Sequence, residues 1–432
     1  MVPELLSKFF VAYWHYNFAM PSLSDKLKAL GVHLGTAEIQ PPANPSTVRR
    51  QSALEEELGG RWLTTRQGDT FVVERSFPAD YVHGSVPIKI TAPLDMVAHW
   101  ARDERISQLD LSKFAFLDTE TSGLSGGTGT YAFMVGAGRY QGDEFKLSVF
   151  FMRDPHEEPA LLEALIDFLA PCSALVTFNG KAFDIPLLRA RYELNQIPFP
   201  FEGYAHLDLL PLARRLWRDR LPSRALKYLE EFVLEAPRSS EEVPGYEIPW
   251  LYFDYLRTGD ITPLKGVFYH NSMDVVAMTA LLNLVAGMLS DPHGTDLSHG
   301  QDVIALAKLF EDLNLWDDAA LLYERGLRTS LPMEDFWKAI QRLSALERRR
   351  GNIESSLELW RRAALEGHIY AHIELAKYFE HTAKDPAAAL EWTTSARKHL
   401  ENSNLPAYII RHWSEELDHR QQRLQTRLNK KP

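Results

Sequence analysis

The stretch FAFLDTETSGL, from Phe114 to Leu124, carries the strongest structural signal in this sequence of 432 residues. It opens on four apolar residues and ends in acidic, hydroxyl and glycine residues, a pattern typical of a buried strand that runs into a turn. Side chains two apart along a strand point the same way, so Asp118 and Glu120 present paired carboxylates. Such a pair is unfavourable at a buried position unless a cation neutralises it, whereas two exposed acids need no ligand. Taken alone, the stretch leaves both interpretations open.

Strands and helices alternate after this stretch. Strands are predicted at residues 131–140, 144–152 and 174–178, and helices at residues 159–169 and 185–194. A hairpin through Gly142 joins the first two strands. After the helix at 185–194, helical patterns dominate to residue 289. The pattern predicts an α/β domain over residues 110–290, with a mixed central sheet flanked by helices. Before it we expect an N-terminal extension and linker at 1–54 and a β-rich lead-in at 55–109, in which His83 is more typical of a structural residue than of a ligand.

Residues 300–430 show a different, repetitive pattern. Aromatic residues recur at Tyr323, Trp360 and Trp392, at intervals of 37 and 32 residues. A small residue stands four positions before and three positions after each of them: Ala319 and Gly326, Ser356 and Ala363, Ala388 and Ser395. A period near 34 predicts an all-α domain of tetratricopeptide-like hairpins, with a non-repetitive helical bundle as the alternative.

Composition excludes some kinds of site. The single cysteine, Cys172, excludes disulfides within the chain and cysteine-based zinc sites, and it favours a cytoplasmic location. The formal charge of −11 argues against attraction of polyanions to the whole surface but allows a local basic groove. The apolar run from Phe9 to Met20 is too short to span a bilayer, so no membrane segment is expected. One hypothesis is that natural translation starts at Met20.

Two further acids could join the pair, although each also has a structural explanation. Asp184 lies where a predicted strand passes into a helix, so it could either cap that helix or face the carboxyl-end edge of the sheet. Asp274 could form a capping box with Asn271 if the helix begins there. If that helix begins earlier, His270 and Asp274 lie one turn apart on one face. The sequence does not choose between these helix starts.

As an ordered set, Asp-x-Glu, Asn-x4-Asp and His-x3-Asp resemble the DEDD 3′–5′ exonucleases of the ribonuclease H-like fold. The resemblance covers about residues 110–290 and is closest to the YprB-like family, some members of which also carry tetratricopeptide repeats. It extends to His206-Leu-Asp208 and to Leu226-Lys-Tyr-Leu-Glu-Glu231. We expect Asp208 to cap the helix that follows it, the alternative being a place in the cleft.

The resemblance implies a catalytic site that holds two divalent cations, Mg²⁺ or Mn²⁺. By it, Asp118, Glu120 and Asp274 hold one cation, and Asp118 and Asp184 engage the second. The sequence departs from both main subclasses of the family, which place either a histidine five residues before the last aspartate or a tyrosine four before it. Here Tyr269 is at minus five and His270 at minus four. We predict that His270 is the general base, because an ordinary imidazole pKa of roughly 6.5 suits proton abstraction better than a phenol near 10.

Substrate-binding residues are expected in two places. The resemblance implies contacts from Thr119, Leu124 and Asn179, beside the carboxylates. The glycine-rich segment around Leu124 would let a terminal nucleotide approach the backbone, or it simply forms a tight turn. Residues 214–227 carry six basic residues and one acid, and we expect Arg215, Trp217 and Arg218 to contact phosphates and a base. A solvated helix face is the alternative for this patch.

Together these features predict a metal-dependent 3′–5′ exonuclease acting on single-stranded DNA or RNA, with a helical-repeat tail that binds a protein partner. A nucleic-acid-binding scaffold that does not cleave is the first alternative, favoured by the order of Tyr269 and His270 and by the net acidity. An endonuclease is the second, because this fold hosts several cleavage modes.

Overall fold

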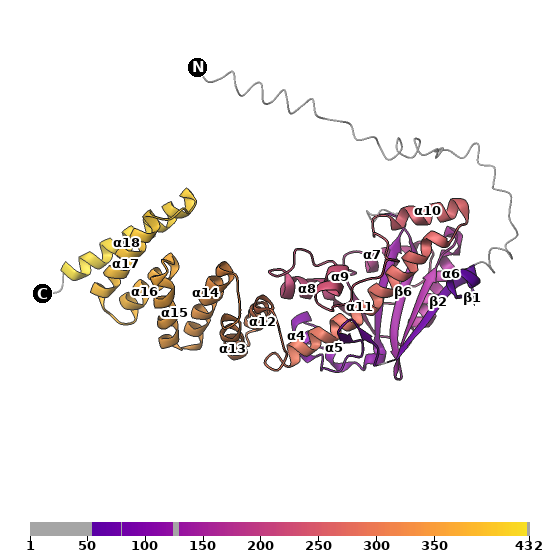
Figure 1. The fold of residues 1–432 in the computed structure, drawn as a ribbon, viewed down its shortest axis with the longest axis horizontal. Helices are drawn as coiled ribbons and strands as arrows, with labels where there is room; N and C mark the ends of the chain where they lie inside the picture. The colour runs from indigo at the N-terminus through magenta and orange to yellow at the C-terminus, as the bar shows by residue number, and fades with distance from the viewer. Residues whose placement is uncertain (1–53, 79, 124–128, 430–432) are drawn as a thin grey trace, which may run out of the picture. The chain divides into compact units, whose positions relative to one another are not determined.

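The computed structural model describes residues 54–78, 80–123 and 129–429, so the proposed start at Met20 and the substrate contact expected of Leu124 lie outside the described residues. Its centre is a seven-stranded mixed sheet in the order β1-β2-β7-β6-β5-β8-β9 (Figure 1). The strands are β1 (Arg61–Thr65), β2 (Gly68–Pro78), β5 (Phe114–Thr121), β6 (Ala132–Gln141), β7 (Glu144–Phe151), β8 (Ala174–Thr177) and β9 (Ala205–Asp208). Strand β5 pairs antiparallel with β6 and parallel with β8, which confirms the predicted mixed sheet.

The β-rich lead-in is part of this sheet. Strand β2 pairs antiparallel with β7 from Phe71 to Pro78, and β1 pairs with β2 at the edge of the sheet. Between β2 and β5 the chain forms short elements: the two-residue strands β3 (Val82–His83) and β4 (Val86–Pro87), the helices α4 (Asp95–Ala101) and α5 (Arg105–Gln108), and a 3₁₀ turn at Leu111–Lys113. His83 is buried and its ring bonds Glu230 at 2.7 Å, a contact within the protein that supports the structural interpretation of this histidine.

Helices cover both faces of the sheet: α6 (Glu158–Leu169), α7 (Asp184–Leu194), α8 (Leu209–Trp217), α9 (Leu226–Phe232), α10 (Ile248–Thr258) and α11 (Lys265–Ser290). The pleat of β5 divides the core between them. Phe114 and Phe116 face the core that includes α8 and α11, whereas Ala115 and Leu117 face the core that includes α6, α7 and α10. Side chains further along β5 continue this alternation, so Asp118 and Glu120 lie on the α11 side.

Helix α11 is the central helix of the domain and lies across the strands (Figure 1). Together with the 3₁₀ turn before it, it is the one helix among the described residues that is long and apolar enough to cross a membrane. The span Thr262–Ser290 has a mean hydropathy of 1.7, but 78% of its most apolar window is buried inside the protein. Contacts with the sheet account for that apolarity, as expected for a core helix.

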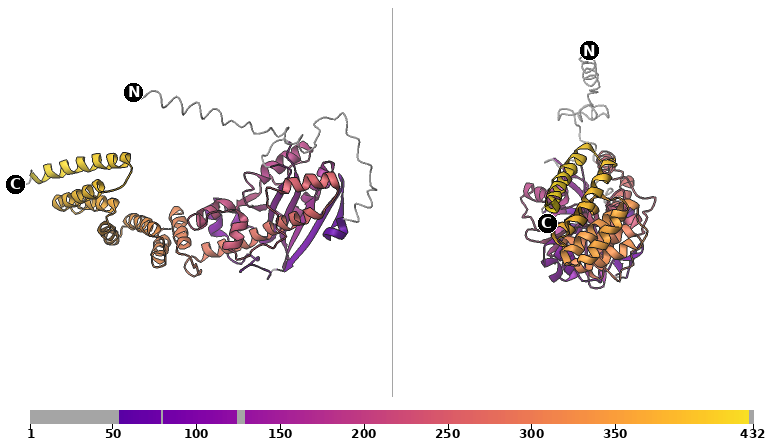
Figure 2. Two further views of the ribbon diagram at one scale, coloured as in Figure 1. Left: turned by 45° about the horizontal axis from the view of Figure 1, so that its top comes forward. Right: turned by 90° about the vertical axis from the view of Figure 1, so that its left-hand side faces the viewer.

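The C-terminal region is all-helical, as predicted. Its helices are α12 (Gly300–Asp312), α13 (Trp316–Leu327), α14 (Met333–Arg350), α15 (Ile353–Leu365), α16 (Ile369–His381), α17 (Pro386–Glu401) and α18 (Ala407–Asn429). Figure 2 shows them in orange to yellow, following one another as antiparallel hairpins. The second helices of the first two hairpins carry Tyr323 and Trp360, both buried together with the small residues around them.

The third hairpin departs from the expected positions by one residue. Trp392 is only half-buried, whereas Thr393 is fully buried between Ala389 and Ala396. The positions equivalent to Ala319, Tyr323 and Gly326 are therefore Ala389, Thr393 and Ala396. The sequence pattern places Trp392 among the packing positions, but this aromatic residue stands one position before the buried one. The regular hairpins agree with a tetratricopeptide-like array, which stays a prediction.

Helix α8 and the residues that follow it contact the first helix of this region, α12. Arg215 pairs with Asp312 at 2.5 Å, and Arg220 pairs with Asp302 at 2.9 Å. In the opposite sense, Lys308 of α12 pairs with Asp219 at 2.7 Å. Part of the basic segment predicted to bind nucleic acid is thus neutralised by α12.

Candidate active site

The pleat of β5 and the early start of α11 bring four of the predicted residues together. Helix α11 begins at Lys265, so Asp274 lies in its third turn and the capping interpretation of Asn271 and Asp274 is wrong. His270 and Asp274 share one face, with His270 Nε2 at 3.5 Å from Asp274 Oδ2 and 3.8 Å from Glu120 Oε1. Asp118 lies on the same side of β5 as Glu120, opposite α11.

Asn271 belongs to the site, although only a capping role was predicted for it. Its side chain is fully buried, and its Nδ2 donates to Asp118 Oδ2 at 2.8 Å. Room for it comes from Gly136, the partner of Asp118 in the neighbouring strand β6. A Cβ at position 136 would stand 2.2 Å from the Asn271 Oδ1 atom, so a side chain there would displace Asn271. A glycine inside a strand signals such a close approach.

Asp184 does not cap α7. Phe183 takes the cap position without a side-chain hydrogen bond, and Asp184 is the first helical residue. Its Oδ1 accepts a 2.5 Å hydrogen bond from the hydroxyl of Thr119, which lies on β5 between the paired acids. Thr119 points to the α7 side of the strand, so its hydroxyl binds an acid of the site rather than standing free for a substrate.

The structure confirms that Asp208 caps a helix, and it shows that the same carboxylate also binds the loop between β8 and α7. Its carboxylate accepts from the backbone N–H of Leu210 at 3.0 Å, which caps α8. It also accepts from the backbone N–H groups of Asn179 and Lys181, at 2.8 and 3.1 Å. Asn179 has a φ of 71°, a left-handed conformation that costs free energy outside glycine. The two hydrogen bonds to Asn179 and Lys181 hold the loop between β8 and α7 in that shape, and the third ties the same carboxylate to the start of α8.

The Asp208→Ala variant is therefore expected to lose about 2–4 kcal/mol of unfolding free energy, because three backbone N–H groups lose a charged acceptor. Urea unfolding monitored by circular dichroism measures the loss. Asp110→Ala is the matched control, since Asp110 is exposed and accepts a single backbone N–H, from Ser112. Equal losses in the two variants would contradict the clamp on the loop.

A buried arginine and two buried glutamates complete the surroundings of α11, and the sequence analysis missed all three. Arg238 is 2% exposed, and its guanidinium donates to Glu230 at 2.5 Å, to Glu242 at 2.9 Å and to Asp274. Glu242 also accepts from His270 Nδ1 at 3.0 Å. Glu230 lies on the buried face of α9 with Leu226 and Leu229, whereas Arg238 and Glu242 come from the segment before α10, which has no periodicity that would place their side chains.

His270, not Tyr269, faces the acids. The hydroxyl of Tyr269 accepts from the backbone N–H of Ser239 at 3.0 Å, which directs it to the segment before α10. Glu242 fixes His270 through Nδ1 and leaves Nε2 toward Glu120 and Asp274. This placement supports the choice of His270 over Tyr269.

The acids are buried close to one another, which disfavours their ionised forms. Burial and the neighbouring charges of Asp274 and Glu120 raise the pKa of Asp118 well above its usual range. Burial likewise raises the pKa of Glu120 to about 8 and that of Asp184 to about 6, although His270 and Thr119 respectively oppose the shift. Carboxylates that are held together and desolvated in this way favour binding of a cation.

The same charges act on His270. Burial lowers the pKa of His270, but the hydrogen bond from its ring to Glu242 and the charges of Asp274 and Glu120 outweigh burial and raise it to about 9. With the carboxylates ionised, the imidazole therefore holds a proton near neutrality. The base role predicted from an ordinary imidazole pKa requires that the carboxylate charge be offset first.

The donor set fits hard divalent cations, although the side chains have not converged on one point. In the parts of the chain that are described, no three acidic, histidine or cysteine side chains already form a coordination shell. The acids instead engage Asn271, Thr119, Arg238 and His270. All the candidate ligand atoms are carboxylate oxygens, which Mg²⁺ and Mn²⁺ prefer over the ligands typical of zinc.

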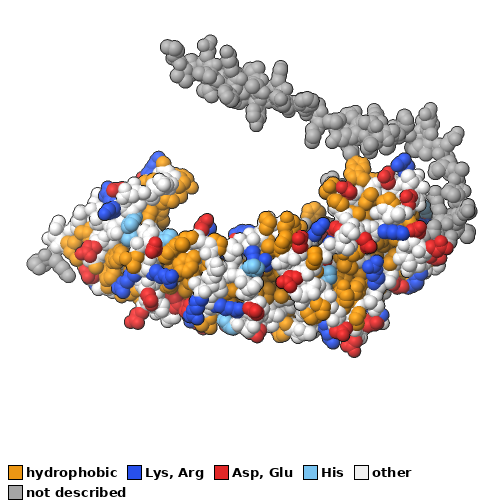
Figure 3. All heavy atoms as spheres, viewed as in Figure 1, with side chains coloured by type: hydrophobic (Ala, Val, Ile, Leu, Met, Phe, Trp, Pro, Cys, Tyr) orange, Lys and Arg blue, Asp and Glu red, His pale blue; other side chains and the backbone are white. Residues whose placement is uncertain are grey.

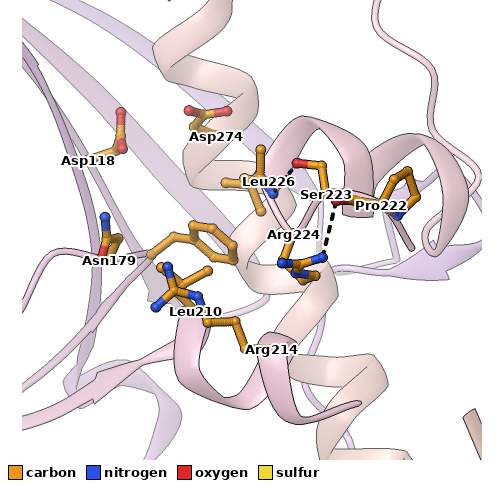
Figure 4. A pocket seen from close by; sticks show the side chains of 11 residues that line it. Asp118, Asn179, Leu210, Arg214, Pro222, Ser223, Arg224, Leu226 and Asp274 are labelled. Carbon is orange, nitrogen blue, oxygen red and sulfur yellow. Dashed lines mark hydrogen bonds between the residues drawn. The ribbon is translucent and has the colours of Figure 1, made fainter. Parts of the chain in front are cut away.

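A cleft leads from the acids to a basic wall. It has a volume of about 490 Å³, and Asp118 and Asp274 lie at one end of it (Figure 4). Arg214 of α8 and Arg224, in the segment before α9, line the opposite side, with Leu210 and Leu226 between (Figure 4). The cleft is also lined by Phe178 and Asn179, from the loop that Asp208 holds.

The structure corrects the predicted substrate patch. Trp217 is 1% exposed in the core, so no base can stack on it, and Arg215 is paired with Asp312. Arg218 is 75% exposed beside Asp219 and is not among the residues that line the cleft. The cationic residues of the cleft are their neighbours Arg214 and Arg224. Elsewhere, on the face drawn in Figure 3, acidic and basic side chains are interspersed.

Comparison with known proteins places this architecture. A family model described as the RNase_H superfamily matches residues 115–286. Over 282 residues the chain is 34% identical to a Bacillus subtilis (strain 168) protein described as uncharacterized protein YprB, a match that covers 64% of this chain and 67% of that protein. A solved family B DNA polymerase from Pyrobaculum calidifontis is similar over 67% of this chain and 38% of its own, at 14% identity and a TM-score of 0.31.

The matched segment contains the core of the sheet from β5 to β9, all four acids and His270. The identity to YprB extends over most of both chains. The chain therefore belongs to the ribonuclease H superfamily, in the YprB-like family.

Proposed function

We propose that this protein is a metal-dependent nuclease that hydrolyses phosphodiester bonds, acting as a 3′–5′ exonuclease on single-stranded DNA or RNA. One observation carries the proposal: a cleft with buried acids at one end and two arginines on the opposite wall. Acids held at raised pKa bind cations, and arginines bind the phosphates of the strand. The superfamily supports a nuclease, and the direction of cleavage rests on the DEDD pattern of the acids.

Asp118, Glu120 and Asp274 would hold one divalent cation, and Asp118 and Asp184 a second. When bound, a pair of such cations activates a water molecule and stabilises the leaving oxygen of the phosphodiester. Asn271 and Thr119 keep Asp118 and Asp184 in place, because each donates a hydrogen bond to one of these carboxylates. Both side chains thus prepare the acids before any ligand arrives.

His270 is the proposed proton acceptor. Its Nδ1 is held by Glu242, so Nε2 is the atom free to take a proton on the side of the acids. Since carboxylate charge raises the pKa of His270, neutralising that charge returns the pKa toward its ordinary value near roughly 6.5. An imidazole in that range accepts a proton efficiently at neutral pH.

The cleft suits a single strand. Arg214 and Arg224 would bind the backbone phosphates, and the aromatic ring of Phe178 would contact a base near the acids. Neither contact reads base identity, so little sequence preference is expected. The helical hairpins of the C-terminal region would bind a protein partner, as helical repeats commonly do.

The test is incubation of the purified protein with end-labelled single-stranded DNA and RNA in Mn²⁺ or in EDTA. Supporting the proposal requires a ladder of products that shortens from the 3′ end and disappears in EDTA. Internal cuts would instead indicate an endonuclease. Binding of the strand without cleavage in Mn²⁺ would contradict the proposed enzymatic activity and would indicate a nucleic-acid-binding scaffold.

A further inference from the structure

Arg238 is the least expected charge near the site. Its side chain is 2% exposed, yet a buried guanidinium is stable only when its donors are matched. Here Nε donates to Glu230, Nη1 to Glu242 and Nη2 to Asp274, so all three nitrogens are used on three different acids. These contacts raise the pKa of Arg238 above its ordinary value despite burial, so it is always charged.

Contacts on Asp274 divide its two oxygens. Arg238 binds Oδ1, while Oδ2 lies on the side of His270, at 3.5 Å from Nε2. The guanidinium therefore fixes the rotation of this carboxylate about its own axis. It holds Oδ1 on the side of Arg238 and leaves Oδ2 on the side of His270.

Glu242 extends the same control to His270. Its Oε1 accepts from both Arg238 Nη1, at 2.9 Å, and His270 Nδ1, at 3.0 Å. Moving the guanidinium would move this shared oxygen, and with it the ring of His270. One arginine thus sets the orientation of an acid and of the histidine that are four residues apart on α11.

Glu230 anchors the arginine to the scaffold. It lies on α9 with its side chain 1% exposed, and its Oε1 bonds His83 of β3 at 2.7 Å while Oε2 accepts from Arg238. The chain of contacts from β3 to α11 is direct and buried throughout. The guanidinium of Arg238 is consequently held by the protein itself, through Glu230, and needs no ligand to keep its position.

We propose that Arg238 is a positioning residue for the cation-binding acids, which orients Asp274 directly and His270 through Glu242. The inference rests on the proposed nuclease function, since it concerns the same acids. Arg238 is not among the residues that line the cleft. Its role is to pre-form the ligand arrangement, as residues behind metal ligands commonly do.

The test measures Mn²⁺ binding directly, by titration with electron paramagnetic resonance of free Mn²⁺, on the full-length protein. The double variant Arg238→Gln/Glu230→Gln removes one positive and one negative charge, so the local charge is kept while the clamp is lost. Its dissociation constant for Mn²⁺ is expected to rise about 10-fold. Arg238→Lys keeps the charge but cannot reach three acids with one fork, and a rise of roughly threefold is expected.

The matched control is Arg220→Gln/Asp302→Asn, which removes another buried ion pair, between the segment that follows α8 and helix α12. Both double variants are expected to melt at lower temperature, but the control should bind Mn²⁺ like the wild type. If the first double variant does not fold, Arg238→Lys carries the comparison. Wild-type affinity in every folded Arg238 variant would overturn the positioning role alone. A wild-type protein that binds no Mn²⁺ would overturn the proposed function and the inference with it.

Discussion

The Asp118→Asn variant is expected to hydrolyse a single-stranded substrate roughly 1,000-fold more slowly than the wild-type protein. Asp118 is the one acid assigned to both cations, and asparagine keeps its shape and its hydrogen bond with Asn271 while removing the charge. Initial rates with labelled DNA and RNA in Mn²⁺ measure the loss. Asp143→Asn is the control, because Asp143 lies exposed at the tip of the hairpin between β6 and β7 and should leave the rate unchanged.

The thermal stability of Asp118→Asn in the absence of a cation should rise although its activity falls. Since burial and the charges of Asp274 and Glu120 raise the pKa of Asp118, its ionised form is unfavourable without a cation. Asp118→Asn is therefore expected to melt a few degrees higher than the wild type in EDTA. In Mn²⁺ the order reverses, because only the wild type gains the free energy of cation binding. A slow variant that is also less stable in EDTA would point to general misfolding instead.

Removing the basic wall of the cleft should weaken substrate binding more than chemistry. For Arg214→Gln/Arg224→Gln we expect kcat/KM to fall roughly 100-fold, mostly through KM, because two charge-assisted hydrogen bonds to phosphates are lost. The slope of log Kd against log salt should fall by about 2 in magnitude. Fluorescence anisotropy with a labelled oligonucleotide, in Ca²⁺ to suppress cleavage, measures both.

Arg218→Gln is the matched control for this pair. It removes one positive charge, against two in the double variant, from the adjoining surface, where Arg218 is 75% exposed and outside the cleft. Affinity and salt slope should stay close to the wild-type values. Equal losses in the control and in the double variant would place the strand on the outer surface of α8 and contradict a path through the cleft.

The fold could be predicted from sequence because its decisive strand has an unambiguous pattern. Apolar residues followed by Asp118 and Glu120 predicted both the buried strand β5 and the face that its acids share. The same kind of pattern could have shown that Trp217 is a core residue and not one that contacts a base. It lies eight residues after Leu209 on a helix whose buried stripe includes Leu212 and Leu216, a helical spacing that predicts core.

Other parts of the site could not be predicted, because local pattern does not determine them. The roles of Asp184 and Asp274 depended on where two helices begin, and boundaries are the weakest part of such predictions. Arg238 and Glu242 lie in a segment without periodicity, so only the tertiary fold directs their side chains. The pKa of His270 is likewise set by acids distant in sequence, and an ordinary value was the wrong starting point for it.

Pairing between α8 and α12 has a consequence for how a polyanion meets this acidic chain. Asp312 and Asp302 take up the charge of Arg215 and Arg220, while Arg214 lines the cleft. The C-terminal helices thereby mask the outer side of a basic helix and leave its potential concentrated at one opening. Under the proposed function, a diffusing strand would be drawn to the mouth of the cleft rather than along the outer side of α8, so that most encounters would begin where the strand enters.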